Sequence, residues 1–243
     1  MIQSCKSKNN NVSIVTVTYN DNHGLASTLE SIANTAIHPF KVIIVDGAAA
    51  VSTIEIVYRY NSLLNIELIS EGDCGIYDAM NKGRKRVTTK LVHYLNSGDT
   101  IDGDPYKLCD APCLFPVVII DDTCCRRWFD KIKLNGYGYC HQGVLFPSNH
   151  AEYNVELKIG ADFDVVCKTF PRGLVELPIV KTGNVNYGLG GVSSQEYHKA
   201  EIELLASVAQ NLSMWDGFLI RAVIYVKRLI PRFIRRRFAN YFI

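Results

Sequence analysis

The strongest constraint on the fold is the alternation of strand and helix patterns in the first hundred residues. Residues that are apolar and β-branched on both faces predict buried strands at 12–18, 41–46, 65–70 and 90–95. Helical patterns lie between them at residues 25–32, 52–61 and 76–86, the second opened by a capping-box pattern from Ser52 to Glu55. Strands separated by helices predict an α/β fold whose mostly parallel sheet has helices on both faces.

The rest of the chain is less regular. A strand at 117–120 with a hairpin partner at 126–129, a strand at 139–146, a helix at 159–168, a glycine-rich loop at 188–194 and a helix at 199–210 are predicted. No repeat or linker divides these elements. With 243 residues, 48% of them apolar, the chain has ample material for a core, so we expect one domain over residues 1–216.

The N-terminus and the cysteines predict a cytosolic protein. Residues 1–11 are polar and lack the apolar segment of a secretory signal, and no apolar stretch approaches the roughly 20 residues that cross a bilayer. The eight cysteines have no regular spacing. Cys109 and Cys113 with Cys124 and Cys125 would make a four-thiolate zinc site, but neither pair has the usual spacing, and free thiols are favoured.

Polar side chains follow each of the four predicted parallel strands. They are Thr18, Tyr19 and Asn20, then Asp46, then Glu71 and Asp73, and finally Asn96, Ser97 and Asp99. Ligands of such sheets bind beyond the carboxyl ends of the strands. The carboxylates gathered at one edge therefore predict a binding site there.

Two segments are the most specific in the chain: residues 70–83 (SEGDCGIYDAMNKG) and residues 95–99 (LNSGD). They closely resemble the family 2 glycosyltransferases of bacterial polysaccharide assembly. The resemblance continues, in the family's order, in residues 15–20 (VTVTYN), Asp46-Gly47, His141-Gln142, residues 161–164 (ADFD) and residues 190–194 (GGVSS). It covers residues 12–195, and a long ordered series of motifs is far more specific than one short match.

This resemblance implies a GT-A fold with a nucleotide-binding half at about 12–100 and an acceptor-binding half at about 101–198. It also implies a UDP-sugar donor, a divalent metal (Mn²⁺ or Mg²⁺) and inversion at the anomeric carbon. It assigns the metal to Asp99, since a cation held by a carboxylate neutralises charge on the leaving diphosphate. Many relatives carry two or three acids where this chain has a single one in residues 96–99.

The resemblance places Tyr19 against the uracil face and Asp46 on its polar edge. An aromatic ring stacks on any base, and a carboxylate accepts a hydrogen bond from a ring N–H. The other donor-site residues that it implies are Thr18, Asn20, Asp73, Lys82, Asn96 and Ser97. Lys82 and Arg84 have a second interpretation, as part of a solvated helix face.

Inverting transfer needs a general base to take the proton of the acceptor hydroxyl. The resemblance assigns this role to Asp162. Asp164 points about 200° away on a helix, so only one of the two faces the site. Either carboxylate also has an interpretation as a helix cap. The resemblance also gives acceptor contacts to His141, Gln142, Gly190 and Gly191, with the glycines in a flap that excludes water, although a structural histidine is an alternative.

Residues 217–243 form a basic, apolar tail. They contain seven lysines and arginines and no acid, whereas residues 1–216 contain 19 basic and 24 acidic residues. An apolar face beside basic residues and aromatic rings is typical of a helix at an anionic membrane surface. The tail therefore predicts a peripheral protein at the inner face of the cell membrane. Packing on the domain and an oligomer contact are the alternatives, and nucleic acid is not an expected partner.

The resemblance, together with the basic tail, implies an inverting transferase that moves a hexose or N-acetylhexosamine from a UDP-sugar to a lipid-linked saccharide. The product would belong to a cell-surface polysaccharide such as O-antigen or capsule. Because the acidic motif contains only one carboxylate, a nucleotide-sugar-binding protein without catalysis is the alternative. A dinucleotide oxidoreductase is disfavoured, since no G-x-G-x-x-G follows the first strand.

Overall fold

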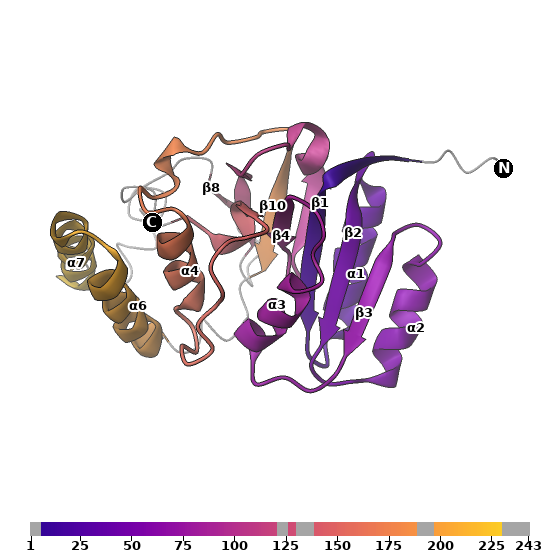
Figure 1. Cartoon of the computed structure of the whole chain (residues 1–243), viewed down its shortest axis with the longest axis horizontal. Helices are drawn as coiled ribbons and strands as arrows, with labels where there is room; N and C mark the ends of the chain where they lie inside the picture. Colours follow the sequence, from indigo (N-terminus) through magenta and orange to yellow (C-terminus); the bar gives the residue numbers. More distant parts are fainter. Residues whose placement is uncertain (1–5, 121–125, 130–138, 189–196, 230–243) are drawn as a thin grey trace.

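A computed structural model of the chain describes residues 6–120, 126–129, 139–188 and 197–229. The predicted α/β fold is confirmed (Figure 1). A six-stranded sheet has the order β3-β2-β1-β4-β9-β6. Its strands are β1 (Ser7–Thr18), β2 (Ile37–Asp46), β3 (Ile66–Ser70), β4 (Leu91–Tyr94), β6 (Cys113–Leu114) and β9 (Val144–Pro147).

The first four strands are parallel, and β9 runs antiparallel to both β4 and β6. The chain moves from β1 outward to β3 and then returns to β4. Right-handed crossovers therefore place α1 (Asn22–Asn34) and α2 (Val51–Tyr60) on one face of the sheet and α3 (Ile76–Arg84) on the other (Figure 1). Helix α3 packs closely on the sheet because Gly83 has no side chain: a Cβ there would lie 2.4 Å from Val15 Cγ1.

A second sheet has the order β5-β10-β7-β8. Its strands are β5 (Thr100–Gly103), β7 (Val117–Ile120), β8 (Arg126–Phe129) and β10 (Gly183–Gly188). The predicted hairpin between residues 117–120 and 126–129 is confirmed as the antiparallel pair β7–β8. Because β6 and β9 complete the first sheet, the two predicted halves of the domain share one core.

Three helices lie at the other end of the molecule (Figure 1). Helix α4 (Ala161–Thr169) packs against α6 (Tyr197–Asn211), and α6 packs against α7 (Met214–Leu229). Helix α7 begins at Met214, so the predicted boundary between residues 216 and 217 falls inside a helix. Within the described ranges, no helix is long and apolar enough to cross a membrane.

Two local predictions were wrong. The capping box at Ser52 does not form: α2 begins at Val51, and the Ser52 hydroxyl donates instead to Asn22 Oδ1 at 3.1 Å. The predicted strand at 139–146 begins only at Val144, because residues 141–143 form a 3₁₀ turn, and pairing with β4 follows that turn. Short 3₁₀ segments of this kind have no periodicity that a sequence pattern reveals.

Candidate functional site

The carboxyl ends of the parallel strands meet at one edge of the sheet, as predicted. Thr18 at the end of β1 lies beside Asp46 at the end of β2, and Asp46 lies beside Ser70 at the end of β3. The Ser97 amide, just after β4, donates to the Val17 carbonyl at 3.1 Å. The loops that leave these strands therefore form one continuous rim.

Helix α1 fixes the turn that carries Asp99. The Thr28 hydroxyl donates to the Asp99 carbonyl at 2.7 Å and accepts from the Gly98 amide at 3.1 Å. Ser97 Oγ donates to Asp21 Oδ2 at 2.8 Å, so the Ser97 hydroxyl, predicted to contact the donor, already has a structural partner. Gly98 has a φ of +92°, which a residue with a side chain rarely adopts.

The Asp99 carboxyl group points into the protein. Only 5% of the residue is exposed, and Oδ1 accepts a long hydrogen bond, 3.4 Å, from the Gly188 amide. Burial raises the pKa of Asp99 to about 8. The carboxylate therefore lacks the charge compensation that it needs to stay ionised at neutral pH.

The residues of this turn fit a hard divalent cation. Within the part of the chain that the structure describes, Asn96 Oδ1 is buried without a hydrogen-bond partner. An orphaned amide oxygen and an under-compensated carboxylate in one turn are oxygen ligands of the kind that Mg²⁺ and Mn²⁺ prefer. No group of three or more His, Cys, Asp or Glu side chains able to hold a metal occurs among the described residues, so phosphate and water would have to complete the coordination.

Tyr19 and Asn20 form the exposed start of the loop after β1. The Tyr19 ring is 68% exposed, and Asn20 takes the left-handed conformation with a φ of +53°. The ring is thus free to stack on a flat ligand at the rim. Its contact with uracil stays a prediction, as do those of Thr18, which is buried, and of Asn20.

Asp46 is held by backbone amides of the loop that follows β2. Its side chain is fully buried, with Oδ1 accepting from the Ala48 amide at 3.0 Å and Oδ2 from the Ala50 amide at 2.9 Å. Both oxygens therefore shape the loop between β2 and α2, and the contact of Asp46 with a base stays a prediction. Asp73 lies closer to the rim: it is half-buried, it accepts from the Gly75 amide at 2.9 Å, and its carboxylate packs against Gly47.

The basic residues of α3 also bind protein groups. Lys82 Nζ lies 3.3 Å from both Glu71 Oε1 and Asp78 Oδ2 and donates to the Gly72 carbonyl at 2.6 Å. Arg84 Nη2 donates to the His150 carbonyl at 2.6 Å. Lys82 thus stabilises the loop before α3, and its contact with phosphate stays a prediction. Arg84 stabilises the loop after β9.

Asp162 and Asp164 lie in the first turn of α4 and have different environments. Asp164 is buried: it accepts from Ser207 Oγ at 3.1 Å and from Asn211 Nδ2 at 2.8 Å, and it pairs with Lys168 at 2.7 Å. Asp162 is half-buried, and its Oδ1 accepts from the Phe163 amide at 2.7 Å. Asp164 is thus bound by α6 and Lys168, whereas Asp162 is only half-buried, and the role of Asp162 as the base stays a prediction.

Burial raises the pKa of Asp162 to about 6. Hydrogen bonds from backbone N–H groups oppose this shift, and the negative charge of Glu203 adds to it. A carboxylate with a pKa just below neutrality is ionised at pH 7 and is still basic enough to accept a proton.

The His141 ring is buried, which favours the alternative of a structural histidine, and its contact with an acceptor stays a prediction. It is 5% exposed, and its Nε2 lies 2.6 Å from the Tyr153 hydroxyl within a cluster of aromatic rings. Desolvation lowers its pKa to about 3. Gln142 is half-buried and accepts from the Cys140 thiol, so its acceptor contact stays a prediction. Gly190 and Gly191 lie outside the described residues.

Residues 13–108, which carry the rim and the Asp99 turn, match the family model for glycosyl transferase family 2. This part of the chain is similar to the family 2 glycosyltransferase domain. Curated relatives agree: a PGL/p-HBAD biosynthesis glycosyltransferase of Mycobacterium bovis (strain BCG / Pasteur 1173P2) is 25% identical over 244 residues, which cover 92% of each chain. The same identity and coverage hold for its counterpart in Mycobacterium tuberculosis (strain ATCC 25177 / H37Ra). The chain is a glycosyltransferase.

Solved structures show that this glycosyltransferase has the GT-A fold. TarS 1-349 of S. aureus in complex with UDP superposes with a TM-score of 0.64 at 15% identity, over 85% of this chain and 68% of that one. The mannosyltransferase PcManGT from Pyrobaculum calidifontis, in complex with GDP-Man and Mn²⁺, gives a TM-score of 0.55 at 15% identity, over 82% and 63%. The glycosyltransferase spans 41% of the longer TarS chain.

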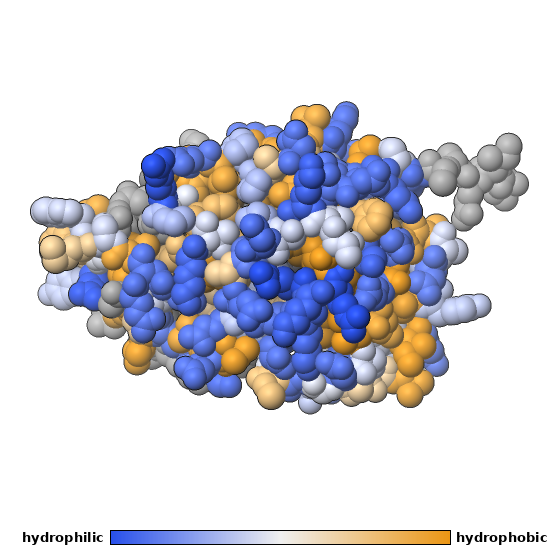
Figure 2. All heavy atoms as spheres, in the orientation of Figure 1, coloured by the Kyte–Doolittle hydropathy of each residue, from blue (hydrophilic) through white to orange (hydrophobic). Residues whose placement is uncertain are grey.

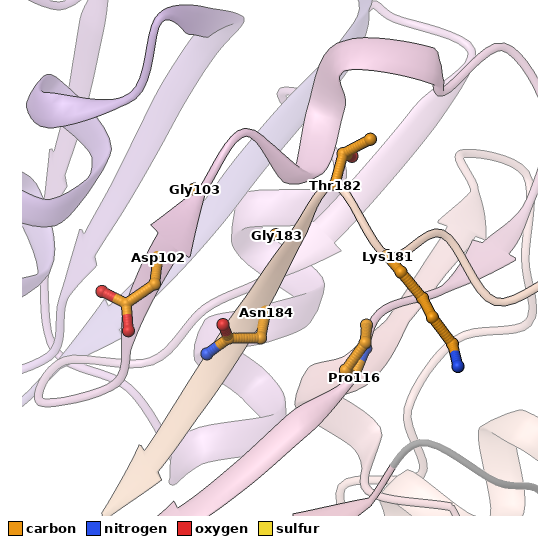
Figure 3. Close-up of a pocket in the computed structure, with 7 residues that line it drawn as sticks. All are labelled: Asp102, Gly103, Pro116, Lys181, Thr182, Gly183 and Asn184. Atoms are coloured by element: carbon orange, nitrogen blue, oxygen red, sulfur yellow. The ribbon is translucent and has the colours of Figure 1, made fainter.

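Two further features of the glycosyltransferase lie away from the rim. The Cys109 and Cys113 thiols are 3.6 Å apart and buried, and they are free thiols, while Cys124 and Cys125 lie outside the described residues. A cavity of about 350 Å³ is lined by Asp102, Lys181, Thr182 and Asn184 (Figure 3). It lies at the Gly183 end of β10, the opposite end from Gly188 and Asp99, so it is separate from the candidate site.

The structure also brings forward residues that the sequence patterns did not single out. Asn81 holds Tyr153 through two backbone hydrogen bonds of 2.9 and 3.0 Å, and the Tyr77 hydroxyl donates to the Ile159 carbonyl. Both residues lie in the motif 70–83 but contact the segment that leads to Asp162, not the rim. A spacing pattern within α3 carries no information about a partner some eighty residues away.

Proposed function

We propose that this glycosyltransferase is an inverting enzyme that moves a hexose or N-acetylhexosamine from a UDP-sugar to a lipid-linked saccharide. The product would belong to a cell-surface polysaccharide of the O-antigen or capsule type. The TarS complexes with UDP and UDP-GlcNAc support the nucleotide, and the mycobacterial relatives, named for PGL/p-HBAD biosynthesis, support a role in assembling a glycoconjugate.

The observation that carries the proposal is the environment of Asp162. Its carboxylate is half-buried at the start of α4, is held by a backbone N–H and has a pKa raised to about 6. Inversion requires a base on the side of the sugar opposite the leaving nucleotide. Asp162 would accept the proton of the acceptor hydroxyl as its oxygen attacks the anomeric carbon and the bond to the diphosphate breaks.

For the donor, we propose that Tyr19 stacks on uracil and that Asp73 lines the same wall. Asp99 and Asn96 would hold Mn²⁺ or Mg²⁺, which when bound neutralises charge on the diphosphate. The exposed Tyr19 ring and the oxygen ligands of the Asp99 turn support these assignments. The Asp99 turn would orient the diphosphate through the rigid contacts with Asp21 and Thr28.

Purified protein should release UDP when it is given a UDP-sugar, a lipid-linked diphosphate saccharide and Mn²⁺. A panel of UDP-hexoses and UDP-N-acetylhexosamines, assayed for UDP release and for a lengthened lipid-linked product, identifies the donor. Hydrolysis without acceptor is the background control. If no donor gives UDP with any acceptor or metal, the proposed reaction is wrong.

We further propose that α7 and the basic tail lie on an anionic membrane, as a peripheral enzyme at the inner face of the cell membrane requires. The apolar side chains of α7 that the structure describes as exposed are Met214 (89%), Trp215 (77%), Phe218 (62%), Leu219 (48%) and Tyr225 (63%). Figure 2 has the orientation of Figure 1, and at the end of the molecule that carries α7 it shows both hydrophobic residues and residues of intermediate hydropathy. Arg221 is exposed on the same helix, and six more basic residues follow it in the sequence.

Replacing Trp215 and Phe218 together by alanine should weaken binding to vesicles of phosphatidylethanolamine and phosphatidylglycerol. Two large side chains that enter the interface each contribute about 1.5–3 kcal/mol, so a loss of at least tenfold is expected in a flotation assay. UDP binding should stay unchanged. Replacing Val155 and Val175, which are exposed elsewhere on the domain, is the matched control. Unchanged flotation of the Trp215/Phe218 variant would refute the membrane role of α7.

A further inference from the structure

The turn that leads into α4 is held by a side chain from a distant helix. Glu203 on α6 accepts hydrogen bonds from three consecutive backbone amides, which we name the base turn: Lys158 at 3.0 Å to each oxygen, Ile159 at 2.8 Å and Gly160 at 2.9 Å. The base turn ends immediately before Ala161, the first residue of α4, and Asp162 is the second.

This contact replaces the usual local cap of the helix. The first N–H groups of a helix have no partner within it, and a Ser, Thr, Asp or Asn at the N-cap normally supplies one. The N-cap of α4 is Gly160, which has no side chain to do so. The Glu203 carboxylate instead accepts from the amides at the positive end of the helix dipole, where a negative charge is favoured.

The base turn is held from its other side as well. The Tyr77 hydroxyl on α3 donates to the Ile159 carbonyl at 2.5 Å, and the Tyr77 ring stacks on Tyr153 with centroids 5.7 Å apart. Ile159 therefore has its N–H bound by α6 and its C=O bound by α3. Such a double constraint fixes the direction in which the first turn of α4 presents its side chains.

The groups that face Asp162 come from several elements. Glu203 approaches from α6, Tyr77 from α3, and Tyr153 and Cys140 from the loops around β9. The negative charge of the Glu203 carboxylate disfavours ionisation of Asp162, which raises the pKa of Asp162 in addition to the effect of burial.

We propose that Glu203 is the positioning residue for the general base: it anchors the base turn to α6 and so aims the Asp162 carboxylate at the acceptor hydroxyl. This inference rests on the proposed role of Asp162. It gives α6 a function in catalysis, although α6 lies outside the part of the chain that matches the family model.

Glu203→Gln in the full chain should lower kcat about ten- to a hundredfold, because small misplacements of a reacting group have effects of that size. The KM for the UDP-sugar should stay unchanged, since the rim at Tyr19 is built on other elements. The acid limb of the pH profile of kcat/KM, near pH 6 in the wild type, should move to lower pH, because the neutral side chain no longer disfavours the Asp162 carboxylate.

Glu203→Asp separates geometry from charge. It keeps the negative charge but is one methylene too short for the same three contacts, so kcat should fall while the acid limb stays near its wild-type position. This variant also serves if Glu203→Gln does not fold. Ser207→Ala, which removes the α6 hydroxyl that donates to Asp164, is the matched control for loosened packing of α6 on α4: it should lower the Tm without moving the acid limb.

Wild-type kcat and an unmoved acid limb in Glu203→Gln, with Asp162→Asn inactive, would overturn the positioning role and leave the general base in place. An equal shift of the acid limb in Ser207→Ala would also overturn it, since loosening alone would then explain the effect. A fully active Asp162→Asn would overturn the proposed base and, with it, the role of Glu203.

Discussion

Asp162→Asn should lower kcat by about 10²–10⁴-fold, because an amide cannot accept the proton of the acceptor hydroxyl. The donor does not contact this side chain in the proposed arrangement, so the Kd for UDP should not change. The half-buried carboxylate is already costly to ionise, and its neutral isostere can still accept from the Phe163 amide. The folded protein should therefore be as stable as the wild type, and the lost rate can be measured on intact enzyme.

Asp164→Asn is the matched control on the same turn of α4. Asn Oδ1 can still accept from Ser207 and Asn211, but the 2.7 Å ion pair with Lys168 is lost. We expect a lower Tm and a kcat within a few-fold of the wild type, the reverse of the result for Asp162→Asn. Steady-state rates and thermal melts of both variants decide the assignment; a larger loss of kcat in Asp164→Asn would give the role of base to Asp164.

Most of the nucleotide-binding half could be predicted from the sequence because its signals are local. The strand predicted at 41–46 and the helix predicted at 76–86 have clear local patterns, and the structure contains them as Ile37–Asp46 and Ile76–Arg84. The position of Asp99 beyond β4 follows from the rule that sites form at the carboxyl ends of parallel strands. Short segments could not be predicted: the 3₁₀ turn at His141–Gly143 has three residues, which are too few to form a recognisable pattern.

The partners of individual side chains could not be predicted, because they depend on contacts between distant segments. Asp46 at a strand end fits a base contact in sequence, yet its two oxygens are taken by amides of the following loop. The hydrogen bond between His141 and the Tyr153 hydroxyl is likewise a contact that no sequence pattern indicates. Glu203 in a helical pattern has no feature that marks it, and only the packing of α6 on α4 brings it to the base turn.

Asp99→Asn should have opposite effects on stability and on activity. In the metal-free protein the Asp99 carboxyl is buried, and the acceptor for the Gly188 amide survives in asparagine. The folded pKa of about 8 lies above the unfolded value of about 3.9, so this group lowers stability progressively as the pH rises from 4 to 8. Asparagine removes that loss, and the Tm at pH 8 without metal should be equal to or higher than that of the wild type.

With donor, acceptor and Mn²⁺ present, the same substitution should lower kcat/KM by about 10²-fold or more, since neutralising charge on the leaving diphosphate is worth several kcal/mol. The Mn²⁺ concentration that gives half-maximal activity should also rise. Asp102→Asn, an exposed carboxylate on the neighbouring strand β5, is the control and should change neither quantity. Wild-type activity of Asp99→Asn that also survives chelation would contradict the metal assignment. A lower Tm of its metal-free form would contradict the stability prediction, because it would show that the fold itself stabilises the Asp99 carboxyl group.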